Sequence, residues 1–526
     1  MPGVEFPTMI DLWIVIAYFA IIFAIGVRAR AKTGVDPEEY FLSSRSLRWP
    51  SIAMSTIATN IEAGHFLSVT GAAYVGGLAQ GNFELNAIFG IVIAAFFFVP
   101  LYLRLKVVTI SQFFEQRFGS RVALAYALLM IGLYALLYLG TALFWAAYAL
   151  DGIFGEMVAW ISDREAVRLA VLIVVLGTFS AVYTYLGGLR AVVRTDIAQF
   201  VLLVGGGLVT VTIAVHHLGG WSELFGTTGH LMHLHLPRDH PTVPWTALIG
   251  MNLLNLNYWG ANQVILQRAL AAKSLWHAQV GLLVGGVLKY VTLLIIVVPG
   301  IAMAGILADT PLDDPDTAYM TLVTRFLPAG LRGLIVCGLF ASLMSTVDSI
   351  FNAVSTLWSI DIYKRHLRPD ASPDDVVRMG KSAIVGTLVT GLLFAFLVVY
   401  LKTGRLQEDP LTHWFNELSY YIKNGFVVLV TAAVFLIRPS RRLVLGAVFA
   451  SMALYLGFTL VWPETSYLVR SGWVIVLSFA AVAAPTMRRN GWRIPFRDLI
   501  AAPDRGVARF GAGLVASLVV VHILFH

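Results

Sequence analysis

Ionisable side chains lie inside long apolar segments of this sequence, where lipid rather than water would surround most groups. A charge at membrane depth is costly unless another protein group or a water-filled cavity compensates it, so each such residue is a candidate for function. We expect these groups to gather around one water-accessible cavity that binds a polar solute or an ion. The ionisable residues at predicted membrane depth are Glu62, His65, Glu84, Asp196, Lys289, Asp348, Glu417 and Lys423.

Part of this set has the chemistry needed to bind a neutral sugar. A sugar offers hydroxyl groups rather than a charge, so its site needs converging hydrogen-bond donors and acceptors, with aromatic rings against the apolar faces of the sugar. The alternatives are a structural role for His65, a structural ion pair between Glu84 and Lys289, and ordinary packing of the aromatic residues. The candidates are Asn60, His65, Glu84, Asn255, Lys289 and Asn416 for the hydroxyl groups, and Tyr258, Trp259 and Phe83 for the ring faces.

The segment from Ser342 to Ser349 predicts a sodium site. Positions 342, 345, 346 and 349 fall on one face of a helix and all carry hydroxyl groups. Sodium prefers oxygen ligands, which such hydroxyls and the carbonyls of an unwound helix can supply, although each hydroxyl can also bond to a carbonyl of its own helix. Asp348 and Asp196 could form a carboxylate pair for a second cation or a proton. An ion pair with Arg194 or another basic neighbour explains Asp196 equally well.

The composition places most of the chain in a lipid bilayer. Of 526 residues, 58% are apolar and 13% are charged, and the mean hydropathy is +0.78, far above that of a soluble domain. The net charge of +7 does not indicate a nucleic-acid partner, because the basic residues lie in short connections between apolar segments. Cys337 is the only cysteine, which excludes a disulfide or a cysteine metal cluster within one chain.

Motifs for enzymatic or nucleotide-driven chemistry are incomplete, so we expect no enzyme. The segment Gly380-Lys381-Ser382 resembles the end of a phosphate-binding loop, but Asp375 stands where that motif requires glycine. Four histidines lie in one loop without the ligand spacing of a zinc site, and we interpret this loop as solvated. They are His230, His233, His235 and His240.

Apolar segments of about 20 residues predict an all-α polytopic membrane protein with about fourteen transmembrane helices. Most of the 37 Lys and Arg residues fall on the cytoplasmic side if both termini lie outside, in a plasma (inner) membrane. The first apolar segment, Ile10 to Val27, is followed by basic residues rather than a cleavage site, so we expect it to be retained. The expected helices lie at about 9–28, 48–72, 83–104, 122–149, 166–185, 190–215, 244–270, 277–304, 330–362, 380–402, 413–437, 441–462, 466–485 and 507–525.

Two of these helices, the second and the seventh, are interrupted by polar, glycine-containing segments at about 59–65 and 255–263. Interrupted helices at matching places in two halves indicate an inverted-repeat transporter, because only a buried binding site can satisfy the unwound backbone. Two packing kinks are the alternative. We therefore expect a flanking helix at 9–28, a first repeat at 48–215, a second repeat at 244–437 and C-terminal flanking helices at 441–525.

The sequence resembles the sodium:solute symporter family, and within it the sodium/glucose and sodium/galactose cotransporters, over about residues 10–440. This resemblance implies a core like that of LeuT-type transporters, with five plus five helices in inverted repeats. It rests on the segments Asn60-Ile61-Glu62-Ala63-Gly64-His65-Phe66, Phe83-Glu84-Leu85-Asn86-Ala87, Gly187 through Asp196, Tyr258-Trp259 through Gln267-Arg268, Leu288-Lys289, and Ser345 through Lys364.

The resemblance also implies roles for individual residues. The sodium ligands would be the carbonyls of Ala58, Ile61 and Ser342 with the hydroxyls of Ser345 and Thr346. The sugar-contacting positions would be Asn60, His65, Glu84, Asn255, Lys289 and Asn416, with Tyr258 as inner gate and Trp259 beside it. Asp196 and Ser349 match a second sodium site, whereas Asp348 replaces a hydroxyl there. The chain departs from the sugar branch at Glu62, which is usually a small residue, at Ala87, which replaces a hydroxyl, and at Asn416, which replaces glutamine.

These observations predict a symporter that imports a neutral, hexose-like sugar with sodium by alternating access. Its partners would be the sugar, sodium and the lipid bilayer, without nucleic acid or an obligatory protein partner. A sodium symporter for an inositol, sialic acid, a nucleoside or an amino acid is the alternative within transporters. A membrane sensor is the alternative from another class, but no predicted cytoplasmic segment is long enough to form an output domain.

Overall fold

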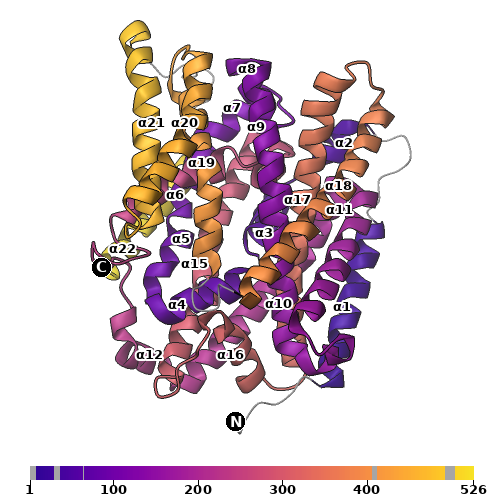
Figure 1. The fold of residues 1–526 in the computed structure, drawn as a ribbon, viewed down its shortest axis with the longest axis vertical. Coiled ribbons are helices and arrows are strands. Elements are labelled where there is room, and N and C mark those ends of the chain that lie inside the picture. The colour runs from indigo at the N-terminus through magenta and orange to yellow at the C-terminus, as the bar shows by residue number, and fades with distance from the viewer. Residues whose placement is uncertain (1–7, 29–35, 63, 405–410, 492–503) are drawn as a thin grey trace.

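The computed structural model describes residues 8–28, 36–62, 64–404, 411–491 and 504–526, which form a bundle of helices (Figure 1). These ranges contain no β-strand and only two isolated bridges, Leu47 with Ala272 and Leu236 with Pro244. The all-α prediction is therefore confirmed. Apolar runs of this length fold as helices in lipid because a helix satisfies its own backbone hydrogen bonds.

Eleven helices in the described ranges are long and apolar enough to cross a membrane. The expected number of fourteen spans is not confirmed, because some expected helices fall within one counted segment. The expected helices at 166–185 and 190–215 both lie within α11 (Glu165–Leu218), where the non-helical backbone of Gly188 separates them, and parts of another expected pair lie within His65–Arg104. The expected span at 244–270 is divided into two helices, each too short to count.

The N-terminal half of the core contains the first interrupted span and ends with α11. It begins after the short α2 (Pro37–Leu42). Its helices are α3 (Trp49–Asn60), α4 (Thr70–Gly76), α5 (Asn82–Leu85), α6 (Ala87–Ile93), α7 (Val99–Arg104), α8 (Ile110–Phe118), α9 (Ser120–Gly132), α10 (Leu139–Val158) and α11. π-Helical turns at His65–Val69, Ala94–Phe98 and Leu133–Tyr138 join several of them.

The C-terminal half follows the surface helix α12 (Trp221–Thr227) and contains the second interrupted span. Its helices are α13 (Ala247–Gly260), α14 (Gln263–Leu270), α15 (Leu275–Ile306), α16 (Ala318–Phe326), α17 (Leu331–Thr356), which continues as a π-helical segment to Leu367, α18 (Pro373–Gly404) and α19 (Leu411–Phe435).

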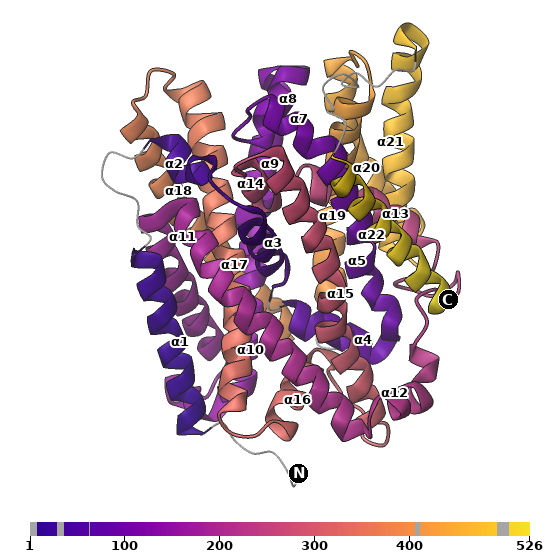
Figure 2. The same ribbon diagram turned by 180° about the vertical axis from the view of Figure 1, so that it is seen from behind.

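Four helices flank this core: α1 (Met9–Arg28), α20 (Arg441–Val461), α21 (Tyr467–Asn490) and α22 (Arg505–Leu524). α1 packs against α11 and α17, and α22 crosses the outside of α15 and α6 (Figure 2). Near the C-terminus, the carbonyl of Phe525 accepts a hydrogen bond of 2.7 Å from the amide of Leu234 in the loop between α12 and α13.

Both predicted interruptions are present, and they have the same backbone conformation. Ile61 ends α3 with φ −88° and ψ 112°, and Asn262 separates α13 from α14 with φ −89° and ψ 111°. The Asn262 side chain accepts a 3.0 Å hydrogen bond from the amide of Val264 and so caps α14. A residue with the same extended conformation at the matching place in each half supports an internal repeat.

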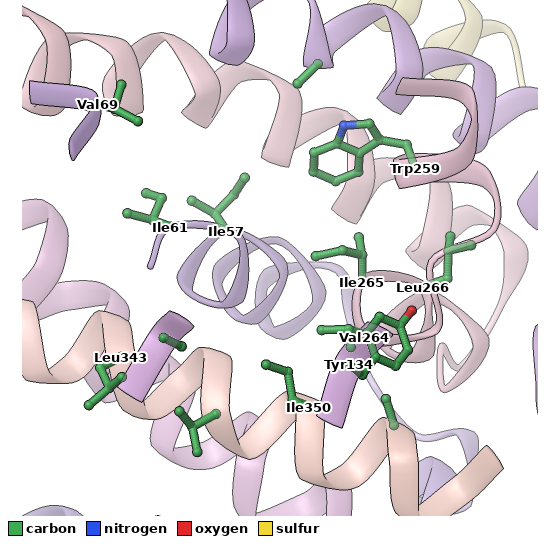
Figure 3. Close-up of a cluster of buried hydrophobic side chains, with 14 of the residues drawn as sticks. Ile57, Ile61, Val69, Tyr134, Trp259, Val264, Ile265, Leu266, Leu343 and Ile350 are labelled. Carbon is green, nitrogen blue, oxygen red and sulfur yellow. The ribbon is translucent and has the colours of Figure 1, made fainter. Parts of the chain in front are cut away.

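The first break lies at the centre of the bundle. In Figure 3 the last turns of α3, marked by Ile57 and Ile61, lie beside α17, which carries Leu343 and Ile350, and α3 also packs against α15. Ile57 and Ile61 are almost fully buried. Apolar packing thus fixes the end of α3 while its last residues face polar groups.

Gly188 forms the bend within α11, which gives a testable prediction. Its φ of +57° is unfavourable for other residues, and a Cβ atom there would lie 2.6 Å from the carbonyl oxygen of Tyr40. We expect Gly188→Ala to destabilise the protein by about 1–3 kcal/mol, measured as a lower thermal unfolding temperature in detergent. Gly205→Ala is the matched control, because Gly205 lies in the same helix and a Cβ atom added there would meet no other atom within 4 Å. Equal unfolding temperatures for the two variants would contradict this prediction.

Candidate functional site

A cavity of about 200 Å³ lies beside the break after α3. Its walls come from both halves of the core, chiefly α3, α5, α10, α13, α15 and α19. All eight residues predicted to contact the substrate line it: Asn60, His65, Glu84, Asn255, Tyr258, Trp259, Lys289 and Asn416. The tertiary structure therefore brings this set together, while the role of each residue in binding stays a prediction.

A buried ion pair joins α15 to α5 at one side of the cavity. The ammonium of Lys289 lies 2.5 Å from Oε2 of Glu84 and also donates to Oδ1 of Asn60. The amide nitrogen of Asn60 donates to the hydroxyl of Tyr258 at 2.8 Å. Glu84 and Lys289 are each 4% exposed or less. Because each charge compensates the other, this side of the cavity can hydrogen-bond a neutral solute without leaving a buried charge unpaired.

The ring of His65 faces the same carboxylate. Its Nδ1 accepts a 3.2 Å hydrogen bond from the amide of Glu62, which places the proton of a neutral imidazole on Nε2. That Nε2 lies 3.7 Å from Oε1 of Glu84. A hydroxyl group near both residues can therefore accept from the histidine and donate to the carboxylate.

Trp259 supplies both an aromatic face and a hydrogen-bond donor. The Lys289 ammonium lies 5.7 Å from its ring centre, and Tyr258 packs edge-on at 5.4 Å. In the described part of the chain, Nε1 of Trp259 is buried without a hydrogen-bond partner. A buried donor of this kind is unfavourable unless a ligand or water accepts from it.

The predicted sodium ligands lie where the end of α3 meets α17. The hydroxyl of Ser342 donates to the carbonyl of Ile61 at 2.8 Å, and that of Thr346 donates to the carbonyl of Thr59 at 3.0 Å. Since the Glu62 amide bonds to His65, the Ala58 carbonyl lacks that helical hydrogen bond. The same contacts show that the hydroxyls face α3, although Thr346 also donates to its own helix at the Ser342 carbonyl (3.2 Å).

Ser345 links this oxygen-rich contact to Asp196 on α11. Its hydroxyl lies 3.1 Å from the hydroxyl of Thr59 and donates to Asp196 at 2.6 Å. The basic partner of Asp196 is Arg268 of α14, at 3.2 Å, whereas Arg194 is exposed. Arg268 also donates to Thr59 at 2.7 Å and to Ser349. A guanidinium group therefore contacts two of the three residues predicted to bind a second cation.

Asp348, the third of these residues, has different hydrogen-bond partners from Asp196. Its carboxylate accepts hydrogen bonds from the hydroxyl of Tyr183 and, at 3.0 Å, from the hydroxyl of Thr184. Both donors belong to α11, so Asp348 ties α17 to that helix. No hydrogen bond joins the two carboxylates in the described residues.

A profile of the sodium:solute symporter family matches residues 40–453. The chain belongs to the sodium:solute symporter family. Sodium/glucose cotransporter 4 of Mus musculus is 33% identical over 462 positions, which cover 81% of this chain and 65% of that protein. The sodium/glucose cotransporter of Vibrio parahaemolyticus is 28% identical and is covered over 98% of both chains. This symporter thus spans about two thirds of the mouse relative and nearly all of the bacterial one.

Solved structures support the fold of this symporter. The outward-open, substrate-bound structure of a sodium-coupled sialic acid symporter aligns with a TM-score of 0.78, at 20% identity, over 91% of this chain and 97% of that one. The symporter therefore has the LeuT-like fold, with a core of five plus five helices, and is a multi-pass membrane protein.

Several residues of the site carry no role in our sequence-based prediction. Thr59 and Arg268 connect the sodium ligands to Asp196, and Ser55 donates to Asp196 as well. Tyr138 and Tyr420 line the cavity. Their polarity at membrane depth could have identified Thr59, Arg268 and Ser55 from the sequence. Tyrosines are common in membrane helices, so nothing in the sequence distinguishes Tyr138 and Tyr420.

Proposed function

We propose that this symporter imports a neutral, hexose-like sugar together with sodium. The observation that carries the proposal is the end of α3, where consecutive residues serve both solutes. Asn60 belongs to the cavity and contacts Lys289, while Ile61 contacts Ser342 of the predicted sodium site. Thr346 belongs to both, because it bonds to α3 and lines the cavity. A cation that draws α17 to α3 would therefore also position the sugar-binding residues.

Alternating access would couple the two solutes. Sodium binding between α3 and α17 favours an outward-open state, sugar then binds in the cavity, and closure delivers both to the cytoplasm. The membrane potential contributes about 2.3 kcal/mol per charge per 100 mV to uptake. The two repeats, proposed at 48–215 and 244–437, would move relative to each other around the site, with 9–28 and 441–525 as flanking helices.

The choice of a neutral sugar rests on charge balance and on relatives. Glu84 and Lys289 compensate each other, so this pair offers no net charge to an ionic solute. Relatives named as sodium/glucose cotransporters support a hexose. We also propose a plasma (inner) membrane location with both termini outside, supported by the distribution of Lys and Arg.

Uptake into proteoliposomes tests this function directly. Labelled glucose or galactose should accumulate when sodium is high outside, and should not accumulate in potassium or choline buffer. Unlabelled inositol, sialic acid, nucleosides and amino acids should compete weakly. Accumulation that is independent of the sodium gradient would refute the coupling. Strong competition by one of these other solutes would identify that solute, rather than a sugar, as the substrate.

We expect one sodium ion to enter with each sugar. A second cation at Asp196, Asp348 and Ser349 remains a prediction from the sequence, but the guanidinium of Arg268 already bonds to Asp196 and Ser349. Dual-label uptake of sodium and sugar should give a ratio of about one, since like charges at one buried site repel. A ratio near two would mean that Arg268 leaves these ligands during transport.

A further inference from the structure

Two charged residues of the cavity, Glu62 and Lys423, take no part in the contacts proposed above. Both line the cavity, Glu62 from the break after α3 and Lys423 from α19. The two side chains therefore bring opposite charges to the same cavity. Neither residue is among the sugar-contacting positions that the family resemblance implies, and Glu62 stands where a small residue is usual.

These two charges differ from the Glu84–Lys289 pair because no direct contact compensates them. In the described part of the chain, neither Glu62 nor Lys423 has an ionic partner within 4.0 Å or a side-chain hydrogen bond. The Lys423 ammonium lies 5.0 Å from the ring centre of Tyr138 and 5.1 Å from that of Tyr420. Aromatic rings attract the cation, but they leave its N–H donors available to a ligand.

A hydroxyl group is the ligand chemistry that satisfies both residues together. It can accept a hydrogen bond from the ammonium and donate one to the carboxylate, so a single hydroxyl group can satisfy two groups that form no ion pair with each other. A sugar carboxylate would bind Lys423 but would be repelled by Glu62. A sugar amine would bind Glu62 but would be repelled by Lys423.

We propose that Glu62 and Lys423 form a charge-balanced clamp for a substrate hydroxyl, which selects an uncharged sugar over both a uronic acid and an amino sugar. This inference rests on the proposed function, since it requires that a sugar enters this cavity. It goes beyond that function because it assigns substrate selectivity to two residues outside the predicted sugar contacts.

Competition binding with three sugars of the same size tests the clamp. Glucose, glucuronate and glucosamine are competed against labelled glucose on purified symporter at saturating sodium and pH 7. The wild type should prefer glucose. Glu62→Gln should shift the ratio of affinities toward glucuronate by about tenfold, and Lys423→Met should shift it toward glucosamine by about tenfold. The double variant, which has no charge at the clamp, should bind glucose about tenfold more weakly and discriminate less against both charged sugars.

Matched controls separate the clamp from a general charge effect. Lys381→Met removes another lysine whose ammonium lies over a tyrosine, 5.2 Å from the ring centre of Tyr185, but Lys381 does not line the cavity. Glu165→Gln removes an exposed carboxylate at the start of α11. Both controls should keep the wild-type ratios.

The outcomes distinguish this inference from the proposed function. Single variants that bind glucose with wild-type ratios for the charged sugars would overturn the clamp and leave the function intact. A wild type that binds none of the three sugars would overturn the proposed function and the clamp with it. Where a single variant binds no sugar, the double variant decides, because wild-type glucose affinity in that variant overturns the clamp.

Discussion

Glu84→Ala is expected to abolish sugar binding, with an affinity loss of about a hundredfold or more. The substitution removes the carboxylate acceptor at the cavity wall and leaves the buried Lys289 ammonium without its 2.5 Å partner. Breaking a buried ion pair from one side costs about 3–5 kcal/mol, because the remaining charge is uncompensated. Equilibrium binding of labelled sugar to purified symporter at saturating sodium measures the loss.

A second carboxylate outside the cavity provides the control for Glu84. Glu417 of α19 contacts Arg470 of α21 at 2.6 Å, yet it does not line the cavity. Glu417→Ala therefore breaks an ion pair of similar length, although its carboxylate is 30% exposed and that of Glu84 only 4%, and it should leave sugar affinity near the wild-type value. Glu84→Gln, which keeps one acceptor, should fall between the alanine variant and the wild type. Normal sugar affinity in Glu84→Ala would remove Glu84 from the site.

The double variant Ser345→Ala, Thr346→Ala should raise the half-saturating sodium concentration by about tenfold or more. It deletes the two side-chain oxygens predicted to bind sodium, so that of the predicted ligands only the backbone carbonyls remain. Ser345 also donates to Asp196, and Thr346 donates to the Thr59 carbonyl, so the variant loosens the link between α17 and its neighbours too. Sugar uptake measured over a series of sodium concentrations gives the shift.

Ser355→Ala separates loss of a sodium ligand from loss of any buried hydroxyl on α17. Ser355 is fully buried on the same helix, and its hydroxyl has no hydrogen-bond partner in the described residues. This control should keep the wild-type sodium dependence. Both variants should elute like the wild type on size exclusion. An unchanged sodium requirement in the double variant would refute the assigned sodium site.

Local patterns of the sequence were sufficient to predict the membrane-embedded α-helical fold and the two interrupted helices. Apolar length determines that a segment spans lipid, and a polar segment with glycine inside such a run interrupts it, as at Ile61 and Asn262. Helical periodicity also predicted correctly that Ser342 and Thr346 share a face, which is the face that contacts α3. These properties depend on residues close together in the chain.

The way in which the expected spans connect did not follow from hydropathy. Gly188 bends the chain between the two expected helices of α11 with a positive φ, which a hydropathy pattern does not report. In the same way, the bonded partners of buried charges were beyond local patterns. Asp196 pairs with Arg268, 72 positions away, rather than with Arg194, and Asp348 bonds to two hydroxyls of α11.

The sequence by itself determined which polar groups must be buried in the membrane. Transfer of such a group into lipid is unfavourable, so each one is readily identified within an apolar segment. Only the tertiary structure decided how those groups are paired. Lys289 compensates Glu84 directly, while Lys423 lies over two tyrosine rings and lines the same cavity as Glu62 without forming an ion pair with it. The physical reason is that a helix fixes the direction of its own side chains, whereas a partner on another helix depends on how distant segments pack.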